Sequence, residues 1–204
     1  LSPEICRQVG WSSPARGETP DIVAGLQWLR IPLPFRLNHV NVWLLDDGDG
    51  WTIIDTGANN AETIALWDEV LQGRKINRIV GTHGHPDHIG LAGLLVERCG
   101  VPLHMTLGEW LAPQVWREEG LKPMRPEVEA YYRGHAISQT AIDLMKRERE
   151  HSKFRNHPLP PSVQRMRDGD ALRLGGRTWR VLVNGGHADE HASLYCEAER
   201  ILIA

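Results

Sequence analysis

Three things are scarce or missing in this 204-residue sequence: paired cysteines, a long apolar run and an excess of charge of one sign. The three cysteines, Cys6, Cys99 and Cys196, are odd in number and widely spaced. That pattern fits reduced thiols better than a disulfide framework. We expect Cys99 and Cys196 to be small core side chains.

No apolar run approaches the roughly 20 residues that a membrane-spanning helix needs. The first residues, LSPEICRQVGW, also lack the basic-then-apolar order of a secretory signal. We therefore expect a soluble, cytoplasmic protein with no membrane partner. The chain begins without Met and stops at the strand-like run RILIA, so we expect it to be part of a longer protein.

The net charge is −3, with 41% hydrophobic and 24% charged residues, which argues against disorder and against a broad cationic surface for nucleic acid. We expect a small-molecule substrate. A nucleic-acid partner is disfavoured but stays open, and the oligomeric state has no signal. A chain of this length suits one well-buried core, so we expect a single domain over 1–204.

Two β-rich runs, 40–46 and 51–55, are joined by the turn sequence DDGDG, which predicts a hairpin. A helix capped by Asn59 or Asn60 should follow it, and then a strand over 76–82.

Apolar residues then recur at helical intervals up to Gly100, and a short strand is expected at 101–104. Residues from about 107 to 160 are charged, helix-favouring and interrupted by prolines, and we interpret them as a helical insertion. Strand patterns return after it. Because the helices separate groups of strands instead of alternating with them, we predict an α/β protein of the α+β type, with stacked sheets and helices outside.

The run HGHPDH at 83–88 places three histidines and one aspartate together. Without a ligand, the imidazoles would compete for protons as the pH fell toward about 6.5, which gains nothing for folding. A bound metal resolves the conflict. In an extended stretch His83 and His85 project to the same side, so two imidazoles can approach one ion.

Proline is unfavourable inside a helix, so we expect the chain to turn at Pro86 on a strand-to-helix loop. This turn brings Asp87 and His88 to the start of the next helix, facing a neighbouring point, so one loop can serve two metals. Imidazole nitrogen and carboxylate oxygen suit Zn²⁺ at about 2.0–2.2 Å, and Fe or Mn accepts the same ligands.

A catalytic zinc takes three protein ligands and leaves one position for water, so His83 and His85 need a distant partner. The best candidate is His187, because Gly185 and Gly186 give its loop conformational freedom. His191, four residues further on, either supports the ligands or packs in the core.

Three segments resemble motifs of the metallo-β-lactamase superfamily, in its branch of glyoxalase II-like hydrolases. They are IIDTG at 53–57, THGHPDHIG at 82–90 and GHADEH at 186–191, and they occur in the family's order. The resemblance covers the chain apart from the insertion. It implies a four-layer αββα sandwich.

The resemblance also implies roles for particular residues. One metal is held by two histidines of the first motif and one of the third, and a second metal site begins within the first motif. Asp55 orients the ligand loop in this interpretation, although it can instead cap the turn that follows it. The implied metal ligands are His83, His85, Asp87, His88 and His187.

The sequence departs from the family pattern in two places. The family's third motif usually reads Thr-Pro-Gly-His, whereas this chain has Asn184-Gly185-Gly186-His187, which loosens the loop. The family's bridging aspartate and last metal histidine come downstream of a strand like RILIA. The second metal site is therefore incomplete within these 204 residues.

The main functional hypothesis is a dinuclear zinc hydrolase in which a metal-bound hydroxide attacks a small ester, thioester or lactone. Asp87 would act catalytically by orienting that hydroxide and accepting its proton. A phosphodiesterase or nuclease, an iron-bearing relative that uses oxygen, and a non-catalytic metal-binding module are the alternatives. No substrate-binding residue can be assigned, although aromatic residues of the insertion either form a lid or pocket wall or pack on the body. These are Trp110, Trp116, Tyr131 and Tyr132.

Overall fold

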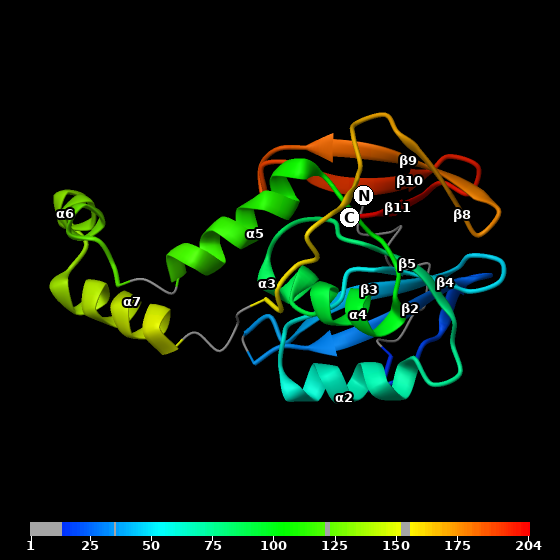
Figure 1. Ribbon diagram of the computed structural model, residues 1–204, viewed down its shortest axis with the longest axis horizontal. Helices are drawn as coiled ribbons and strands as arrows, with labels where there is room; N and C mark the ends of the chain where they lie inside the picture. The colour runs from blue at the N-terminus through cyan, green and yellow to red at the C-terminus, as the bar shows by residue number, and fades with distance from the viewer. Residues whose placement is uncertain (1–13, 35, 121–122, 152–155) are drawn as a thin grey trace, which may run out of the picture.

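Two β-sheets stacked face to face form the body of the protein, with helices beside them (Figure 1). The computed structural model describes residues 14–34, 36–120, 123–151 and 156–204. Within these residues, the larger sheet has seven strands in the order β1-β2-β3-β4-β5-β6-β7 and the smaller has four in the order β11-β10-β9-β8. The strands are β1 Asp21–Val23, β2 Leu26–Pro32, β3 His39–Asp46, β4 Trp51–Ile54, β5 Ile76–Val80, β6 Leu103–Met105, β7 Gln164–Arg165, β8 Ala171–Leu174, β9 Arg177–Asn184, β10 His191–Cys196 and β11 Ile201–Ile203. The helices are α2 Ala61–Val70, α3 Pro86–Ile89, α4 Ala92–Cys99, α5 Leu107–Gly120, α6 Pro126–Gly134 and α7 Gln139–His151.

The strand directions determine where the motif loops meet. Strands β1 to β4 pair antiparallel, and β3 with β4 forms the hairpin expected from the DDGDG turn. From β4 to β7 each pair is parallel. Because parallel strands end at the same edge of a sheet, the loops after β4 and β5 lie side by side. Asp55 opens the first loop, and His83 lies in the second.

Helix α2 illustrates how local sequence sets an element. It starts at the expected cap, where the Asn60 side chain accepts a 2.8 Å hydrogen bond from the Thr63 amide. Its buried face includes Leu66, Trp67 and Val70. Apolar side chains on one face drive the helix onto the sheet, where they are removed from water.

Two buried clusters hold the layers together. One lies between the seven-stranded sheet and helices α2 and α4, and it contains Trp67 and Leu95. The other fills the space between the two sheets, around Trp179 and Leu194. The stacked sheets with helices outside confirm the predicted fold class. On the outer face of the small sheet Arg180 is exposed, and no helix covers it among the described residues, so three of the four expected layers are seen there.

Helices α5, α6 and α7 lie within the segment interpreted as an insertion. Helix α5 starts against the body and leads away from it, and α6 and α7 lie together beyond its end (Figure 1). We call α6 and α7 the arm. Helix α6 has no buried residue, so its contacts contribute little apolar burial.

Cys99 is half-buried and Cys196 is buried, and both are free thiols. Cys6 lies outside the described residues. Among the helices described, none combines the length and the apolar character that crossing a bilayer requires.

His104 on β6 gives the fold a testable pH dependence. Burial, and then the charge of Arg78, lower the pKa of His104 to about 4. His104 is therefore protonated below about pH 6.5 in the unfolded chain but only below about pH 4 in the folded protein. The free energy of unfolding falls as the pH drops through that window. We expect wild type to lose on the order of 2 kcal/mol more than His104→Gln between pH 7 and pH 4, after allowing for partial exposure. Urea unfolding of both metal-free proteins measures this difference, and parallel pH profiles would contradict it.

Candidate metal centre

The candidate site lies where three loops meet at the ends of β4, β5 and β9. The loop after β5 carries His83 and His85, and the loop between β9 and β10 carries His187. The amide of Ala192 donates to the carbonyl of Thr82 at 2.9 Å, which ties the start of β10 to the β5 loop. Gly186 has φ +138°, a conformation that glycine adopts readily, as expected for this loop.

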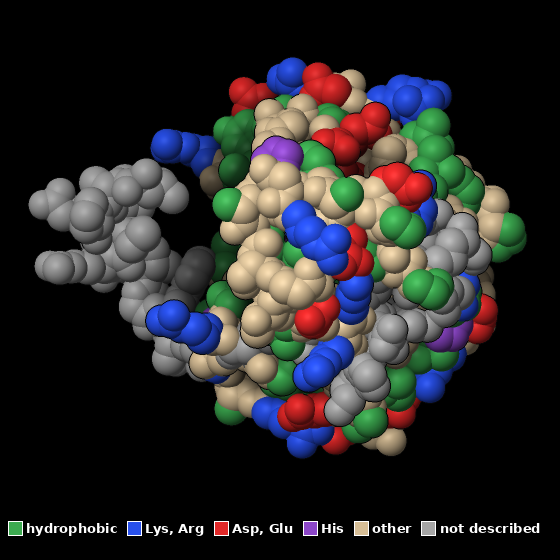
Figure 2. Space-filling model, turned by 90° about the vertical axis from the view of Figure 1, so that its left-hand side faces the viewer, with side chains coloured by type: hydrophobic (Ala, Val, Ile, Leu, Met, Phe, Trp, Pro, Cys, Tyr) green, Lys and Arg blue, Asp and Glu red, His purple; other side chains and the backbone are tan. Residues whose placement is uncertain are grey.

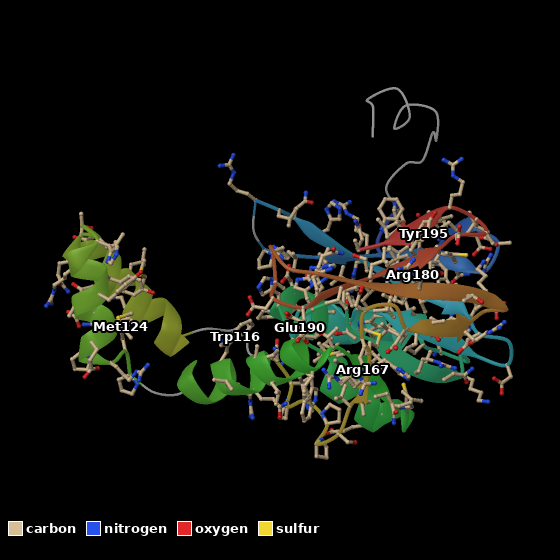
Figure 3. The ribbon with its side chains drawn as sticks, turned by 90° about the horizontal axis from the view of Figure 1, so that it is seen from above. Trp116, Met124, Arg167, Arg180, Glu190 and Tyr195 are labelled. Carbon is tan, nitrogen blue, oxygen red and sulfur yellow. The ribbon has the colours of Figure 1, made fainter. Side chains whose placement is uncertain are left out.

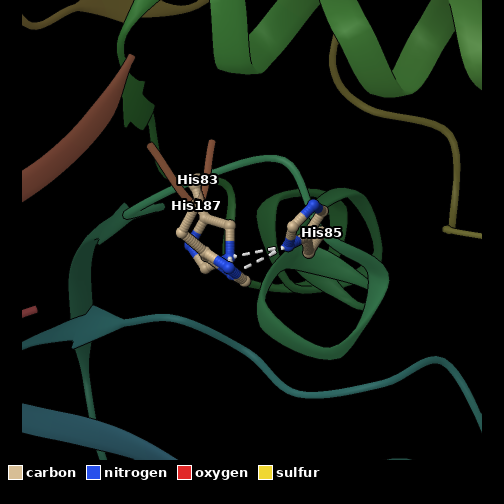
Figure 4. Close-up of side chains that lie close together, drawn as sticks. All are labelled: His83, His85 and His187. Carbon is tan, nitrogen blue, oxygen red and sulfur yellow. Dashed lines mark hydrogen bonds between the residues drawn. The ribbon is translucent and has the colours of Figure 1, made fainter. Parts of the chain in front are cut away.

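Three ring nitrogens converge at this point (Figure 4). His83 Nε2 lies 3.1 Å from His85 Nδ1, and His187 Nε2 lies 3.1 Å from His85 Nδ1 and 3.2 Å from His83 Nε2. Tetrahedral zinc with Zn–N bonds of 2.0–2.1 Å requires ligand nitrogens about 3.3 Å apart. The three imidazoles therefore have the donor type and the spacing to hold one metal ion.

Neighbouring hydrogen bonds set which nitrogen of His83 is free. A carboxylate can only accept, so the Thr82 hydroxyl donates to Asp55 Oδ2 at 2.7 Å. The Thr82 oxygen, 3.0 Å from His83 Nδ1, then accepts the proton on that nitrogen. This leaves His83 Nε2 with a lone pair directed at the other two rings, as a metal ligand requires.

The surroundings also favour the neutral, metal-binding form of two of these histidines. Burial, and then the neighbouring imidazoles, lower the pKa of His83 to about 2. Burial and then the neighbouring His187 also lower the pKa of His85. His83 and His85 are thus neutral at physiological pH and have lone pairs available.

Asp55 connects two of the motif loops. Its carboxylate accepts from the Thr82 amide at 2.8 Å as well as from the Thr82 hydroxyl, and His88 Nδ1 donates to it at 2.7 Å. Asp55 is 3% exposed and has φ +62°, which few residues other than glycine adopt. These hydrogen bonds join the Asp55 carboxylate to the histidine loop. The sequence also allowed Asp55 to cap the turn that follows it.

Asp87 and His88 lie in helix α3, beside the three histidines but not among their converging nitrogens. Pro86 opens the helix, so the chain turns where expected. His88 Nε2 faces Asp87 Oδ2 at 3.9 Å. Burial alone would lower the pKa of His88, but the hydrogen bond and charge of Asp55 raise it overall. The His191 ring contacts the His83 ring in a tilted arrangement, with ring centroids 4.8 Å apart.

Two contributors had no signal in the sequence pattern. Thr82 opens the THGHPDHIG segment, but a threonine hydroxyl has no chemistry that marks it as a supporting group in the sequence. Glu109, at the start of α5, is 2% exposed and accepts hydrogen bonds from the backbone of both histidine-bearing loops. A glutamate in a helix-favouring, charged segment resembles an exposed residue, so only the tertiary structure reveals it.

The four aromatic residues of the insertion have different surroundings. Trp116 on α5 stacks near His85, with ring centroids 6.2 Å apart, and is half-exposed. Figure 3 shows Trp116 on the part of α5 that leads out of the body. Trp110 instead packs against the main core, and its Nε1 donates to Pro160. Tyr131 and Tyr132 contact each other on the arm.

Comparisons with known proteins agree with these motifs. A family model described as the metallo-beta-lactamase superfamily matches residues 36–204. The crystal structure of a beta-lactamase domain protein from Burkholderia ambifaria is 34% identical, with a TM-score of 0.77 over 96% of this chain and 56% of that one. The probable metallo-hydrolase YqjP of Bacillus subtilis is 27% identical over 88% of this chain and 54% of its own length. A hydroxyacylglutathione hydrolase of Idiomarina loihiensis is 22% identical over 76% of this chain and 42% of its own length. The chain spans about half the length of these curated relatives.

Proposed function

The chain belongs to the metallo-β-lactamase superfamily, and on that premise we propose that it is a metal-dependent hydrolase of small esters, thioesters or lactones. The observation that carries the proposal is the convergence of three imidazole nitrogens within 3.2 Å of one another. The hydrogen bond that fixes the His83 tautomer and the lowered pKa values of His83 and His85 suit a cation better than a purely structural cluster. Zinc is the proposed metal, because a set of three imidazole ligands is typical of catalytic zinc.

The bound metal would lower the pKa of water to about 7 and stabilise negative charge that develops on the substrate. The residues of the chain supply the remaining functions. Thr82 and Asp55 hold the His83 ring in one tautomer, so that Nε2 stays unprotonated. Asp87 is partly exposed beside the three histidines. We propose that its carboxylate orients the attacking water and accepts a proton from it.

A second metal site is part of the proposal. His88 is oriented by Asp55 through Nδ1, which leaves Nε2 directed toward Asp87. One imidazole nitrogen and one carboxylate oxygen would contribute to a second zinc ion. A second ion held there would supply further stabilisation of the negative charge on the attacking and leaving oxygens.

The proposed substrate class rests on chemistry and on surface charge. On the face shown in Figure 2, Lys and Arg side chains are interspersed with Asp and Glu, and the described residues there form no continuous basic surface. Such a surface favours a small carbonyl compound over a nucleic acid, whose phosphates need concentrated positive charge. The distant similarity to a hydroxyacylglutathione hydrolase supports thioesters as the first substrates to test.

Elemental analysis of protein purified without chelators, combined with a substrate panel, tests the proposal. We expect bound zinc and hydrolysis of generic thioesters, esters or lactones that stops after metal removal and returns with Zn²⁺. Bound iron would reassign the metal. Turnover of phosphodiesters alone, with a steep loss at high salt, would instead favour a nuclease.

The half-exposed Trp116 ring is placed to contact the acyl part of a substrate bound near His85. We expect Trp116→Ala to raise KM about 2- to 10-fold for aromatic or long-chain acyl groups with little change in kcat, because an aromatic contact contributes about 0.5–1.5 kcal/mol. Steady-state kinetics measure this change. Tyr131→Ala on the arm serves as the control, and an unchanged KM for Trp116→Ala would contradict the assignment.

A further inference from the structure

A buried carboxylate joins the two loops that carry the three histidines. Glu109 Oε2 accepts a 2.8 Å hydrogen bond from the amide of Gly84, between His83 and His85. Its other oxygen, Oε1, accepts a 2.9 Å bond from the amide of Glu190, in the loop of His187. A hydrogen bond from an amide to an ionised carboxylate is about twice as strong as one between neutral groups.

The contact is reciprocal. Glu190 Oε2 accepts a 2.8 Å bond from the amide of Gly108, at the start of α5, and the Thr106 hydroxyl donates to the Glu190 carbonyl at 2.9 Å. Figure 3 shows Glu190 near the end of α5 that joins the body. We call Thr106, Glu109 and Glu190 the clamp. The clamp holds the His187 loop through the backbone amide and carbonyl of Glu190 and through the Glu190 side chain.

The start of α5 also packs directly on the first histidine loop. A Cβ atom at Gly84 would lie 2.7 Å from Pro113 and 2.9 Å from the Glu109 carbonyl, so only glycine fits between the two histidines. The glycine of the H-x-H segment is therefore explained by this contact. It also shows that α5, the first part of the segment interpreted as an insertion, is part of the wall of the candidate metal centre.

We propose that Glu109 is a positioning residue that sets the spacing of the His83, His85 and His187 ligand nitrogens through the two loops. The inference rests on the proposed metal site. The physical reason is conformational entropy, because the His187 loop contains Gly185 and Gly186 and has many alternative conformations. Two backbone bonds to one buried carboxylate remove that freedom before the metal binds. The histidines then need little reorganisation to bind a cation.

Glu109→Gln tests the clamp directly. An amide side chain has one accepting oxygen and one donating nitrogen, so it cannot accept from both Gly84 and Glu190. We expect the zinc affinity of the folded variant, measured by competition with a chromophoric chelator, to fall about 10- to 100-fold. The visible absorption of the cobalt-substituted variant should also shift, because the ligand geometry changes. Glu97→Gln, at an exposed position of helix α4 outside the two loops, removes the same charge and should bind zinc like wild type.

Thermal melting of the metal-free proteins separates positioning from folding. Folded Glu109→Gln with wild-type zinc affinity and an unchanged cobalt spectrum would overturn the inference. If Glu109→Gln does not fold, Thr106→Val decides, since it removes one hydrogen bond from the clamp while conserving volume. Weaker zinc binding by this variant supports the clamp, and wild-type affinity overturns it. Wild-type protein that binds no zinc would instead overturn the proposed function, and this inference with it.

Discussion

We expect His85→Ala to abolish stable metal binding at the three-histidine site and to lower the rate of the proposed hydrolysis at least about a thousandfold. Metal ions contribute several kcal/mol of transition-state stabilisation, and each 1.4 kcal/mol is a factor of ten in rate. His85 Nδ1 lies 3.1 Å from the ligand nitrogens of both His83 and His187. Its removal leaves two of the three nitrogens to hold a metal ion. Elemental analysis and steady-state kinetics on the purified variant measure both effects.

The matched control is His135→Ala, which removes an exposed imidazole on the arm. Its ring contacts Tyr131 and takes no part in the three-histidine cluster. We expect wild-type metal content and activity from this variant. A His85→Ala protein that retained both metal and activity would refute the assignment of the site.

We expect Asp55→Ala to destabilise the metal-free protein by about 4 kcal/mol and to lower its Tm by about 10 °C. The substitution leaves the buried donors of Thr82 and His88 without their acceptor, and each unsatisfied donor costs about 1–3 kcal/mol. Aspartate also tolerates φ +62° better than alanine does, because its short polar side chain can hydrogen-bond locally. Differential scanning calorimetry after chelator treatment measures the change.

Asp68→Ala is the matched control for that substitution. Asp68 on α2 pairs with Arg98 at 2.6 Å, but both side chains are well exposed, so the pair contributes at most about 1 kcal/mol. Asp55→Asn should fall between the two, because asparagine tolerates the positive φ yet cannot accept from all three donors. A Tm for Asp55→Ala within about 2 °C of wild type would show that the carboxylate is not a structural link between the loops.

Much of the fold follows from local signals. Asn60 caps α2, and Gly100 ends α4 with φ +67°, as their positions before and after apolar helical patterns predict. The hairpins β3–β4 and β10–β11 follow from strand patterns joined by turn residues. Propensity and periodicity act over a few residues, so these features can be predicted without knowing the tertiary structure.

The site was predictable only in part, and for a physical reason. His83 and His85 are two residues apart, so extended geometry alone brings their rings together. His187 was predicted from its glycine-rich loop and the family motif, since nothing local shows that a residue 102 positions from His85 lies 3.1 Å from it. Glu109 had no signal at all, because its function arises from the backbone of two distant loops meeting around one side chain.

The central claim is that the His83, His85 and His187 rings share one metal ion. Crystals of zinc-saturated protein measured just above and just below the zinc absorption edge test it most directly. We expect an anomalous difference peak about 2.0–2.1 Å from His83 Nε2, His85 Nδ1 and His187 Nε2. Three ordered rings with no peak between them, or a peak bound elsewhere while this triangle stays empty, would contradict it.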